Sequence, residues 1–256
     1  MPDNAPTPST LDIYLALSHI GQASGALAPL AGEAPEETPR VHVARTMTGE
    51  WRVFLRPDLP AATRATLLAW GPLTLFTDLP RVARLLAPEH APGAPTDDLD
   101  RLGVWVGRTL LFPADLAETL ARRPLMDVVR LEPGADHYGA PAPSAARLRP
   151  ALLPPTAPVP PRDVFPGEQF AALADGVVVA TCESARESEL AAEAWVRTIP
   201  AARGQGHASR VTAAWALDAR RRGKLPFYSH NRANVASAGV ARTLGLIPFL
   251  EDVGYL

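Results

Sequence analysis

The stretch TIPAARGQGHA, Thr198 to Ala208, follows an apolar run and precedes a long segment with helical spacing. It places Gly204 and Gly206 where an expected strand gives way to an expected helix. A turn at such a junction needs at most one glycine. The first amides of a helix lack intrahelical partners, and together with the positive end of the helix dipole they form an anion site. Glycines let the backbone curl there and leave no Cβ between the amides and a phosphate. The pair therefore indicates a phosphate-binding loop.

Two other phosphate-binding motifs are excluded by their further requirements. A Walker loop ends in G-K-[ST], whereas this loop continues G-H-A-S. A Rossmann fingerprint needs a third glycine and an acidic residue about 20 positions on, but no carboxylate lies between Asp218 and Glu251 in the region of the next expected strand. The pattern that remains is R-x-x-G-x-A, and Arg203 adds positive charge that suits a pyrophosphate.

The residues around this loop predict a small domain of strands and helices. Alternating apolar runs and turn residues predict the strands. Apolar residues at helical spacing, followed by glycines that can end a helix (Gly223 and Gly245), predict the helices. The expected elements are a hairpin around Asp175-Gly176, a strand at 190–199, a helix at about 206–222, a strand at 225–229, a helix at 234–244 and one or two strands at 247–256.

The R-x-x-G-x-A pattern resembles the coenzyme A loop of the GCN5-related N-acetyltransferase (GNAT) family, [RQ]-x-x-G-x-[GA]. A second segment, NVASAGVARTLGL from Asn234 to Leu246, resembles the family's N-x-x-[AS]-…-L-G-F motif, and the V-R-T-I-P before the loop resembles its V-x-P-x-x-R-G run. The resemblance covers roughly 170–256. It implies an α/β (α+β) fold with a GNAT-like mixed, mostly antiparallel sheet flanked by helices, and with an additional N-terminal α/β domain.

The resemblance also implies an acetyl-CoA site. Backbone amides of the loop would hold the pyrophosphate, the preceding strand would pair with the pantetheine, and the following helix would contact the cofactor. The residues that it implies for cofactor binding are Thr198, Arg203, Gly204, Gln205, Gly206, His207, Ala208, Ser209, Asn234 and Ser237.

Transfer of an acetyl group to a primary amine by direct attack requires a base for the acceptor ammonium and a route for the thiol to leave. Glu193 is the candidate base, with Glu183 and Glu187 as substitutes. The family often has a tyrosine seven residues after the asparagine, but this chain has Ala241 there. The candidate acid is then Tyr228, with Tyr255 as an alternative. A thiol with a pKa of about 8.5 can also leave without a dedicated acid.

Two functions follow from these features. The first is an acetyl-CoA-dependent N-acetyltransferase that acts on an unidentified small-molecule or protein amine. The second is a non-catalytic acyl-CoA-binding or scaffolding protein with a degenerate acetyltransferase fold. Ala241 favours the second, whereas Glu193 and the complete RGQGHA loop favour the first.

The first half of the chain predicts a separate mixed α/β domain. Its expected elements are a helix at 11–27, a hairpin of 41–47 with 51–57, helices at 61–70 and 79–86, a strand at 103–112 and a helix at 113–122. Nine of the chain's 28 prolines lie in 141–167, which predicts a semi-rigid connection. The expected domains are therefore 1–140, which could be a diverged copy of the same fold, and 168–256, joined by 141–167.

Bulk composition narrows the function classes. A formal net charge of −2 gives no sign of a nucleic-acid partner, and the single cysteine, Cys182, excludes an intramolecular disulfide and a cysteine-rich zinc site. No apolar run approaches the roughly 20 residues that span a bilayer, and the first residues lack a signal-peptide pattern. We expect a cytoplasmic monomer or homodimer without a metal or a membrane partner.

Overall fold

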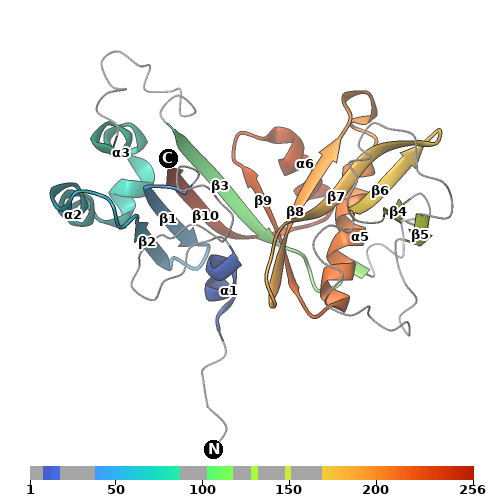
Figure 1. Cartoon of the computed structure of the whole chain (residues 1–256), viewed down its shortest axis with the longest axis horizontal. Helices are drawn as coiled ribbons and strands as arrows, with labels where there is room; N and C mark the ends of the chain where they lie inside the picture. Colours follow the sequence, from blue (N-terminus) through green and yellow to red (C-terminus); the bar gives the residue numbers. More distant parts are fainter. Residues whose placement is uncertain (1–7, 18–37, 87–102, 118–127, 132–147, 151–168) are drawn as a thin grey trace, which may run out of the picture. The chain divides into compact units, whose positions relative to one another are not determined.

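The computed structural model describes residues 8–17, 38–86, 103–117, 128–131, 148–150 and 169–256 (Figure 1). The chain forms two compact units. The first comprises Met1–Thr109, His230–Asn234 and Pro248–Leu256, and the second comprises Leu110–Ser229 and Val235–Ile247. No helix within the described residues is long and apolar enough to cross a membrane.

The units do not follow the boundaries expected from the sequence. Residues 248–256 were expected in the C-terminal domain, but they group with the first unit. Most of the proline-rich connection lies outside the described residues. Its described part, Leu148–Pro150, is the edge strand β5, which pairs with β4. An edge position tolerates proline, because the missing N–H is not needed by a further strand.

The first unit is built on the strand order β2-β1-β10-β3. These strands are β1 (Val41–Thr46), β2 (Trp51–Leu55), β3 (Val104–Leu111) and β10 (Ile247–Tyr255), accompanied by helices α1 (Thr10–Leu17), α2 (Ala61–Thr77) and α3 (Leu79–Leu86). The expected hairpin is confirmed, since β1 and β2 are antiparallel and Gly49 supplies a left-handed turn residue with φ 90°. Apolar residues of β1, β2, β3 and β10 pack with α2 and α3 in one core.

Helix α2 extends beyond the expected 61–70. Its segments before and after Gly71 are joined at a kink, where Gly71 has φ 74° and is followed by Pro72. Proline cannot donate to the preceding turn, and the left-handed glycine redirects the chain. The sequence therefore located the helix but not its continuation past the kink. The expected helix 11–27 is described only as α1, and the rest of it lies outside the described residues.

Charged pairs fix β10 between its neighbours in the first unit. Arg45 on β1 and Arg108 on β3 both donate to the Glu251 carboxylate, at 3.1 and 2.5 Å. On the opposite face of β10, His42 Nε2 lies 2.9 Å from Asp252 Oδ2. The last strand of the chain is thus tied to the first unit on both of its faces.

The second unit has the strand order β9-β8-β7-β6-β4-β5. Its strands are β4 (Val128–Leu131), β5 (Leu148–Pro150), β6 (Gln169–Ala174), β7 (Val177–Glu187), β8 (Ala191–Thr198) and β9 (Leu225–Asn231), and its helical segments are η5 (Pro200–Ala202), α5 (His207–Arg221) and α6 (Val235–Thr243). All pairs from β5 to β8 are antiparallel, whereas β8 and β9 are parallel. The expected hairpin at Asp175-Gly176 is confirmed, with φ 49° and 76°.

Helix α5 packs on one face of this sheet. Of the expected stripe of Ala208, Val211, Trp215 and Ala219, the last three are fully buried and Ala208 is half-buried. Gly223 forms the predicted left-handed stop with φ 75°. At the same end Asp218 accepts hydrogen bonds from Arg130 on β4 and, at 2.9 Å, from Arg222. The mixed α/β class and the mostly antiparallel sheet are therefore as predicted.

The Glu251 pairs make the stability of the protein depend on pH. Burial by itself would raise the pKa of the Glu251 carboxyl, but the hydrogen bonds and positive charges of Arg108 and Arg45 hold it below its ordinary value. A carboxyl with a lowered folded-state pKa stabilises the fold above its unfolded pKa of about 4.3, and this contribution is lost as pH falls through the folded pKa.

Glu251→Gln should therefore lower the urea midpoint at pH 7. The difference from the parent protein should shrink at about pH 3, where the parent carboxyl is also losing its charge. As a control, Glu50→Gln alters an exposed pair with Arg52 and should change the midpoint little, because exposed pairs are worth at most about 1 kcal/mol. A loss in Glu251→Gln that is equal at both pH values would contradict the charge argument.

Candidate functional site

Strands β8 and β9 of the second unit are paired over only a short length. Their parallel register joins Ala191 with Leu225, Ala192 with Pro226 and Glu193 with Phe227. Both strands continue beyond these pairs, to Thr198 and Asn231, and they diverge as they do so (Figure 1). The backbone edge of β8 that faces β9 is therefore released from the ladder just after Glu193.

The loop that follows β8 contains the two glycines of RGQGHA. Gly204 and Gly206 have φ 78° and 81°, so both occupy the left-handed region that other residues rarely adopt. Gly206 is the N-cap residue of α5, and no side chain caps this helix end. A Cβ built on either glycine would meet no atom of the described residues within 4 Å. The two glycines thus form a curled, open loop directly in front of a 15-residue helix.

His207 organises this loop rather than facing solvent. Its side chain is buried, and Nδ1 lies 2.7 Å from Arg210 Nη2 while Nε2 lies 3.3 Å from Gln205 Oε1. A guanidinium can only donate, so Nδ1 accepts and Nε2 carries the proton that is donated to Gln205. The geometry therefore selects a neutral imidazole. Arg210 was not a sequence candidate, although its i+3 spacing from His207 on a helix could have indicated the contact.

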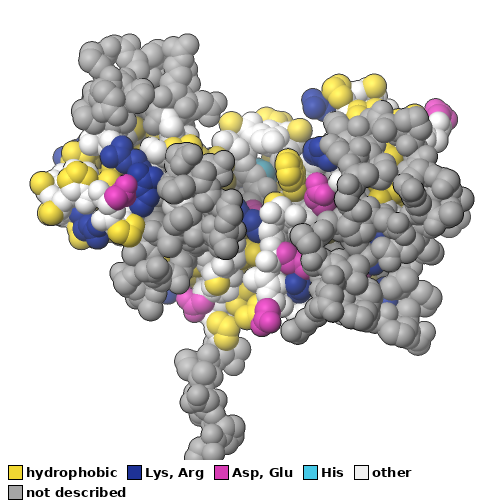
Figure 2. Space-filling view, viewed as in Figure 1, with side chains coloured by type: hydrophobic (Ala, Val, Ile, Leu, Met, Phe, Trp, Pro, Cys, Tyr) yellow, Lys and Arg dark blue, Asp and Glu magenta, His cyan; other side chains and the backbone are white. Residues whose placement is uncertain are grey.

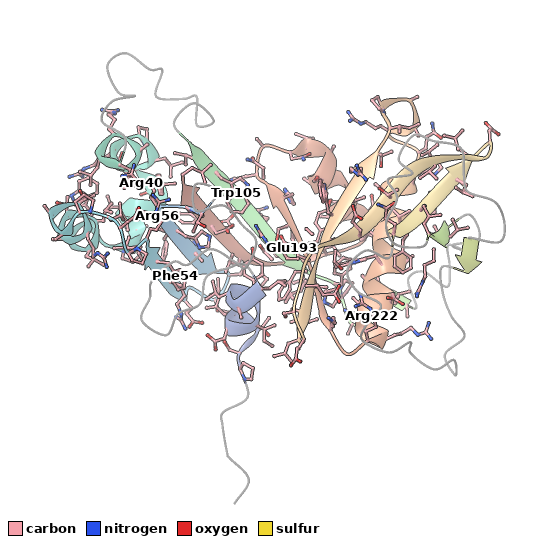
Figure 3. All side chains as sticks on the ribbon, viewed as in Figure 1. Arg40, Phe54, Arg56, Trp105, Glu193 and Arg222 are labelled. Carbon is pink, nitrogen blue, oxygen red and sulfur yellow. The ribbon has the colours of Figure 1, made fainter. Side chains whose placement is uncertain are left out.

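Glu193 is the nearly buried carboxylate at the point where the strands diverge (Figure 3). Its residue is 7% exposed, and Oε2 accepts a hydrogen bond from Arg186 Nη1 at 3.2 Å. A bulge in β7 makes this contact possible. The register shifts between Ser184 and Arg186, so Arg186 lies directly opposite Glu193. A bulge inserts one extra residue and redirects the following side chain. No local pattern in the sequence indicates this bulge.

The two substitute bases are held by other groups. Glu187 binds Lys224 and Arg222, each at 2.6 Å, and Ser184 at 2.7 Å. Burial alone would raise the pKa of Glu187, but these donors hold it below its ordinary value, which makes it a weaker base. Glu183 accepts from Gln169 Nε2 at 3.0 Å. Of the three carboxylates, Glu193 is the one at the end of the β8–β9 pairing.

Neither candidate acid has the surroundings of a proton donor. Burial raises the pKa of Tyr228 to about 12, and its hydroxyl donates to the Ser237 carbonyl of α6 at 3.4 Å. Tyr255 is fully buried in the first unit, where its hydroxyl donates to the Leu75 carbonyl. Both tyrosines act as ties between structural elements.

The other sequence candidates surround the same loop or lie next to α6. Thr198 ends β8, and its carbonyl accepts from Arg203 Nε at 3.4 Å. Ala208 and Ser209 form the first turn of α5, with Ser209 nearly buried. Ser237 lies in the first turn of α6, and Asn234, which is exposed, directly precedes that helix in the chain. These positions have the element order that the sequence predicted.

Acidic and basic side chains of the described residues are interspersed over the face shown in Figure 2. Among the same residues, no group of three or more histidine, cysteine, aspartate and glutamate side chains is placed to hold a metal ion.

Several solved structures show a weak likeness to 60–97% of the chain. A GNAT-family protein from Novosphingobium aromaticivorans is 16% identical over 60% of this chain and 66% of its own length, with a TM-score of 0.37. A GCN5-related N-acetyltransferase-like protein from Streptococcus suis is 15% identical over 68% of both chains, with a TM-score of 0.41. An acetyltransferase of the GNAT family from Colwellia psychrerythraea is 13% identical over 97% of both chains, with a TM-score of 0.40. Scores this low carry no argument about function.

Two sequence comparisons gave different results. No curated protein sequence matches the chain significantly. Residues 167–249, however, match the profile of the GNAT acetyltransferase family. The matched segment contains the diverging strands, the double-glycine loop, α5 and α6. The chain is therefore similar to the GNAT acetyltransferases over residues 167–249.

Proposed function

We propose that this protein is an acetyl-CoA-dependent N-acetyltransferase that moves an acetyl group to a primary amine by direct attack. The observation that carries the proposal is the loop before α5. Gly204 and Gly206 are both left-handed there, and the helix end behind them has no side-chain cap. A family match alone would not distinguish a retained cofactor loop from a degenerate one. The open loop supports a retained one.

The residues present fit a diphosphate. The N-terminal amides of α5 point out of the helix and carry the positive end of its dipole. A Cβ built on residue 204 or 206 meets no described atom within 4 Å, so the loop leaves open space beside the start of α5. Arg203, which is exposed beside the loop, adds a charge at the same place. The buried, neutral His207 fixes Gln205 and Arg210 and so keeps the loop in one conformation.

The divergence of β8 from β9 suits the rest of the donor. A pantetheine arm is a chain of amides, and the released edge of β8 from Ala194 to Thr198 offers backbone donors and acceptors of the kind that extend a sheet. A backbone N–H on this edge would polarise the thioester carbonyl. Both parts of the donor would then be recognised mainly by backbone groups, which explains why few side chains specify the site.

Glu193 supplies the base. Its carboxylate takes a proton from the acceptor ammonium, and the freed nitrogen lone pair can then attack. Acetyl-CoA supplies an acyl group activated as a thioester, so that a new C–N bond forms as the C–S bond breaks and the thiolate leaves with the electron pair. The amine's second proton is lost to solvent or to the thiolate. Arg186 holds Glu193 in place through one carboxylate oxygen.

The position at which the family often has a tyrosine carries no acid in this chain, and this bears on the alternative function. Ala241 stands where the family often has tyrosine, and it is buried in the core of the second unit. Its methyl group cannot donate a proton. A thiol leaving group can depart as a thiolate near neutral pH, so this loss is compatible with turnover. If the protein instead binds acyl-CoA without catalysis, the loop should still bind coenzyme A, and Glu193 should be dispensable.

Gly206→Val should abolish coenzyme A binding. The branched side chain would enter the space in front of the helix amides, and it would also resist a φ of 81°. Isothermal titration of free coenzyme A measures the affinity. A thermal melt of the parent protein at 100 times the dissociation constant should show about 2.7 kcal/mol of added stability.

Gly223→Val is the matched control for backbone strain. Gly223 lies at the other end of the same helix, with φ 75° and with no described atom within 4 Å of a built Cβ. Both variants should lose similar stability, because both force a branched residue into the left-handed region. Only Gly206→Val should lose coenzyme A. Equal affinity in the two variants would show that RGQGHA does not bind the phosphates.

Glu193→Gln should lower turnover of an amine panel by about 10²- to 10⁴-fold, since it removes a general base and keeps the shape of the side chain. Thiol release measures turnover, and calorimetry should show unchanged affinity for coenzyme A. Glu183→Gln is the control, because Glu183 lies on the adjacent strand and pairs with Gln169 instead. Loss of turnover in Glu183→Gln but not in Glu193→Gln would move the base to Glu183.

A further inference from the structure

One oxygen of the Glu193 carboxylate remains available. Arg186 contacts Oε2, and within the described part of the chain no hydrogen-bond partner falls on Oε1. The residue is nevertheless 93% buried, with 7% exposure. This oxygen can therefore accept a hydrogen bond from a ligand donor such as an ammonium group.

Trp195 lies beside this carboxylate on the same face of β8. Side chains alternate along a strand, and Ala192, Ala194 and Val196 pack with α5 in the core. Glu193 and Trp195 therefore face away from α5, separated by one same-face step of about 7 Å. The indole is 55% exposed. A large aromatic surface is thus presented to solvent next to the proposed base, on the part of β8 that no longer pairs with β9.

The position of Arg197 determines which part of an acceptor can lie against the Trp195 indole. Its guanidinium carbon lies 5.6 Å from the Trp195 ring centroid. A cation already interacts with this ring, so a second cation over it would meet like-charge repulsion. The ammonium of an acceptor is better placed at Glu193 Oε1. The ring is left to contact the uncharged body of the acceptor, where flat apolar groups pack best on an aromatic face.

We propose that Trp195 is a specificity-determining residue that selects primary amines carried on a flat apolar body by a short alkyl spacer. The expected effect of Trp195 on turnover rests on the proposed function. The amine would lie at Glu193 Oε1, and the apolar body would lie one side-chain step further along β8, against the indole. Small polar amines would reach the base without using this surface.

Phenethylamine and ethylamine are the probes, with the parent protein, Trp195→Ala and Trp195→Phe compared. The parent should prefer phenethylamine in kcat/KM. Trp195→Ala should reduce the ratio of kcat/KM for phenethylamine to that for ethylamine by about tenfold or more, chiefly through KM, and Trp195→Phe should restore part of it, because stacking and burial of the ring are both lost in alanine. Leu190→Ala is the control, because Leu190 is also exposed (51%) and immediately precedes the first residue of β8, away from Trp195. It should leave the ratio unchanged.

A binding measurement separates this inference from the proposed function. Phenethylamine added in the presence of coenzyme A should give a saturable change in tryptophan fluorescence in the parent and in Leu190→Ala, but not in Trp195→Ala. That result supports the surface even if no amine is acetylated, in which case the proposed function alone fails. An unchanged ratio in Trp195→Ala, or a fluorescence change that persists in it, would overturn the proposal. So would a parent protein with no saturable response and no preference for phenethylamine.

Discussion

The early end of the pairing between β8 and β9 is the constraint on which the site depends. Three residue pairs hold the strands in parallel register, and the last of them contains Glu193. A longer pairing would occupy the edge of β8 with β9 and leave no backbone groups for a ligand. A shorter one would leave Glu193 without a fixed neighbour. The point of divergence therefore places the carboxylate and the free strand edge together, within one unit of the fold.

The charges near that point are arranged by the backbone. The bulge in β7 brings Arg186 opposite Glu193. Arg186 then binds one oxygen of the Glu193 carboxylate, and the other oxygen can accept a hydrogen bond from a ligand. Glu187, the residue after Arg186 on β7, is bound by Lys224, Arg222 and Ser184. Two glutamates close in sequence thus have different roles. Buried ions with a full set of donors hold the sheet and helix together, whereas a buried carboxylate with one unused oxygen is suited to chemistry.

Helix α5 connects the proposed anion site to the core. Trp215 is buried against the sheet, and its indole nitrogen donates to Ser184 Oγ at 3.1 Å. Asp218 ties the far end of the helix to Arg130. These contacts fix the axis of the helix, and hence the direction in which its N-terminal amides point. A ligand held by a dipole and by backbone groups needs such rigidity, because no flexible side chain can correct a misplaced helix.

The sequence by itself determined the local elements and the loop. Paired glycines, a helical stripe and glycine stops are signals carried by neighbouring residues, so the hairpins, α5, α6, the glycine loop at 204–206 and the helix stop at Gly223 were predicted. The candidate base was also predicted, on the strength of a family resemblance. The tertiary structure decided what depends on residues far apart: the bulge that pairs Arg186 with Glu193, the burial of Tyr228 and Tyr255, and the inclusion of the last strand in the first unit. These properties depend on register and on packing between strands, and no periodicity within a single segment records them.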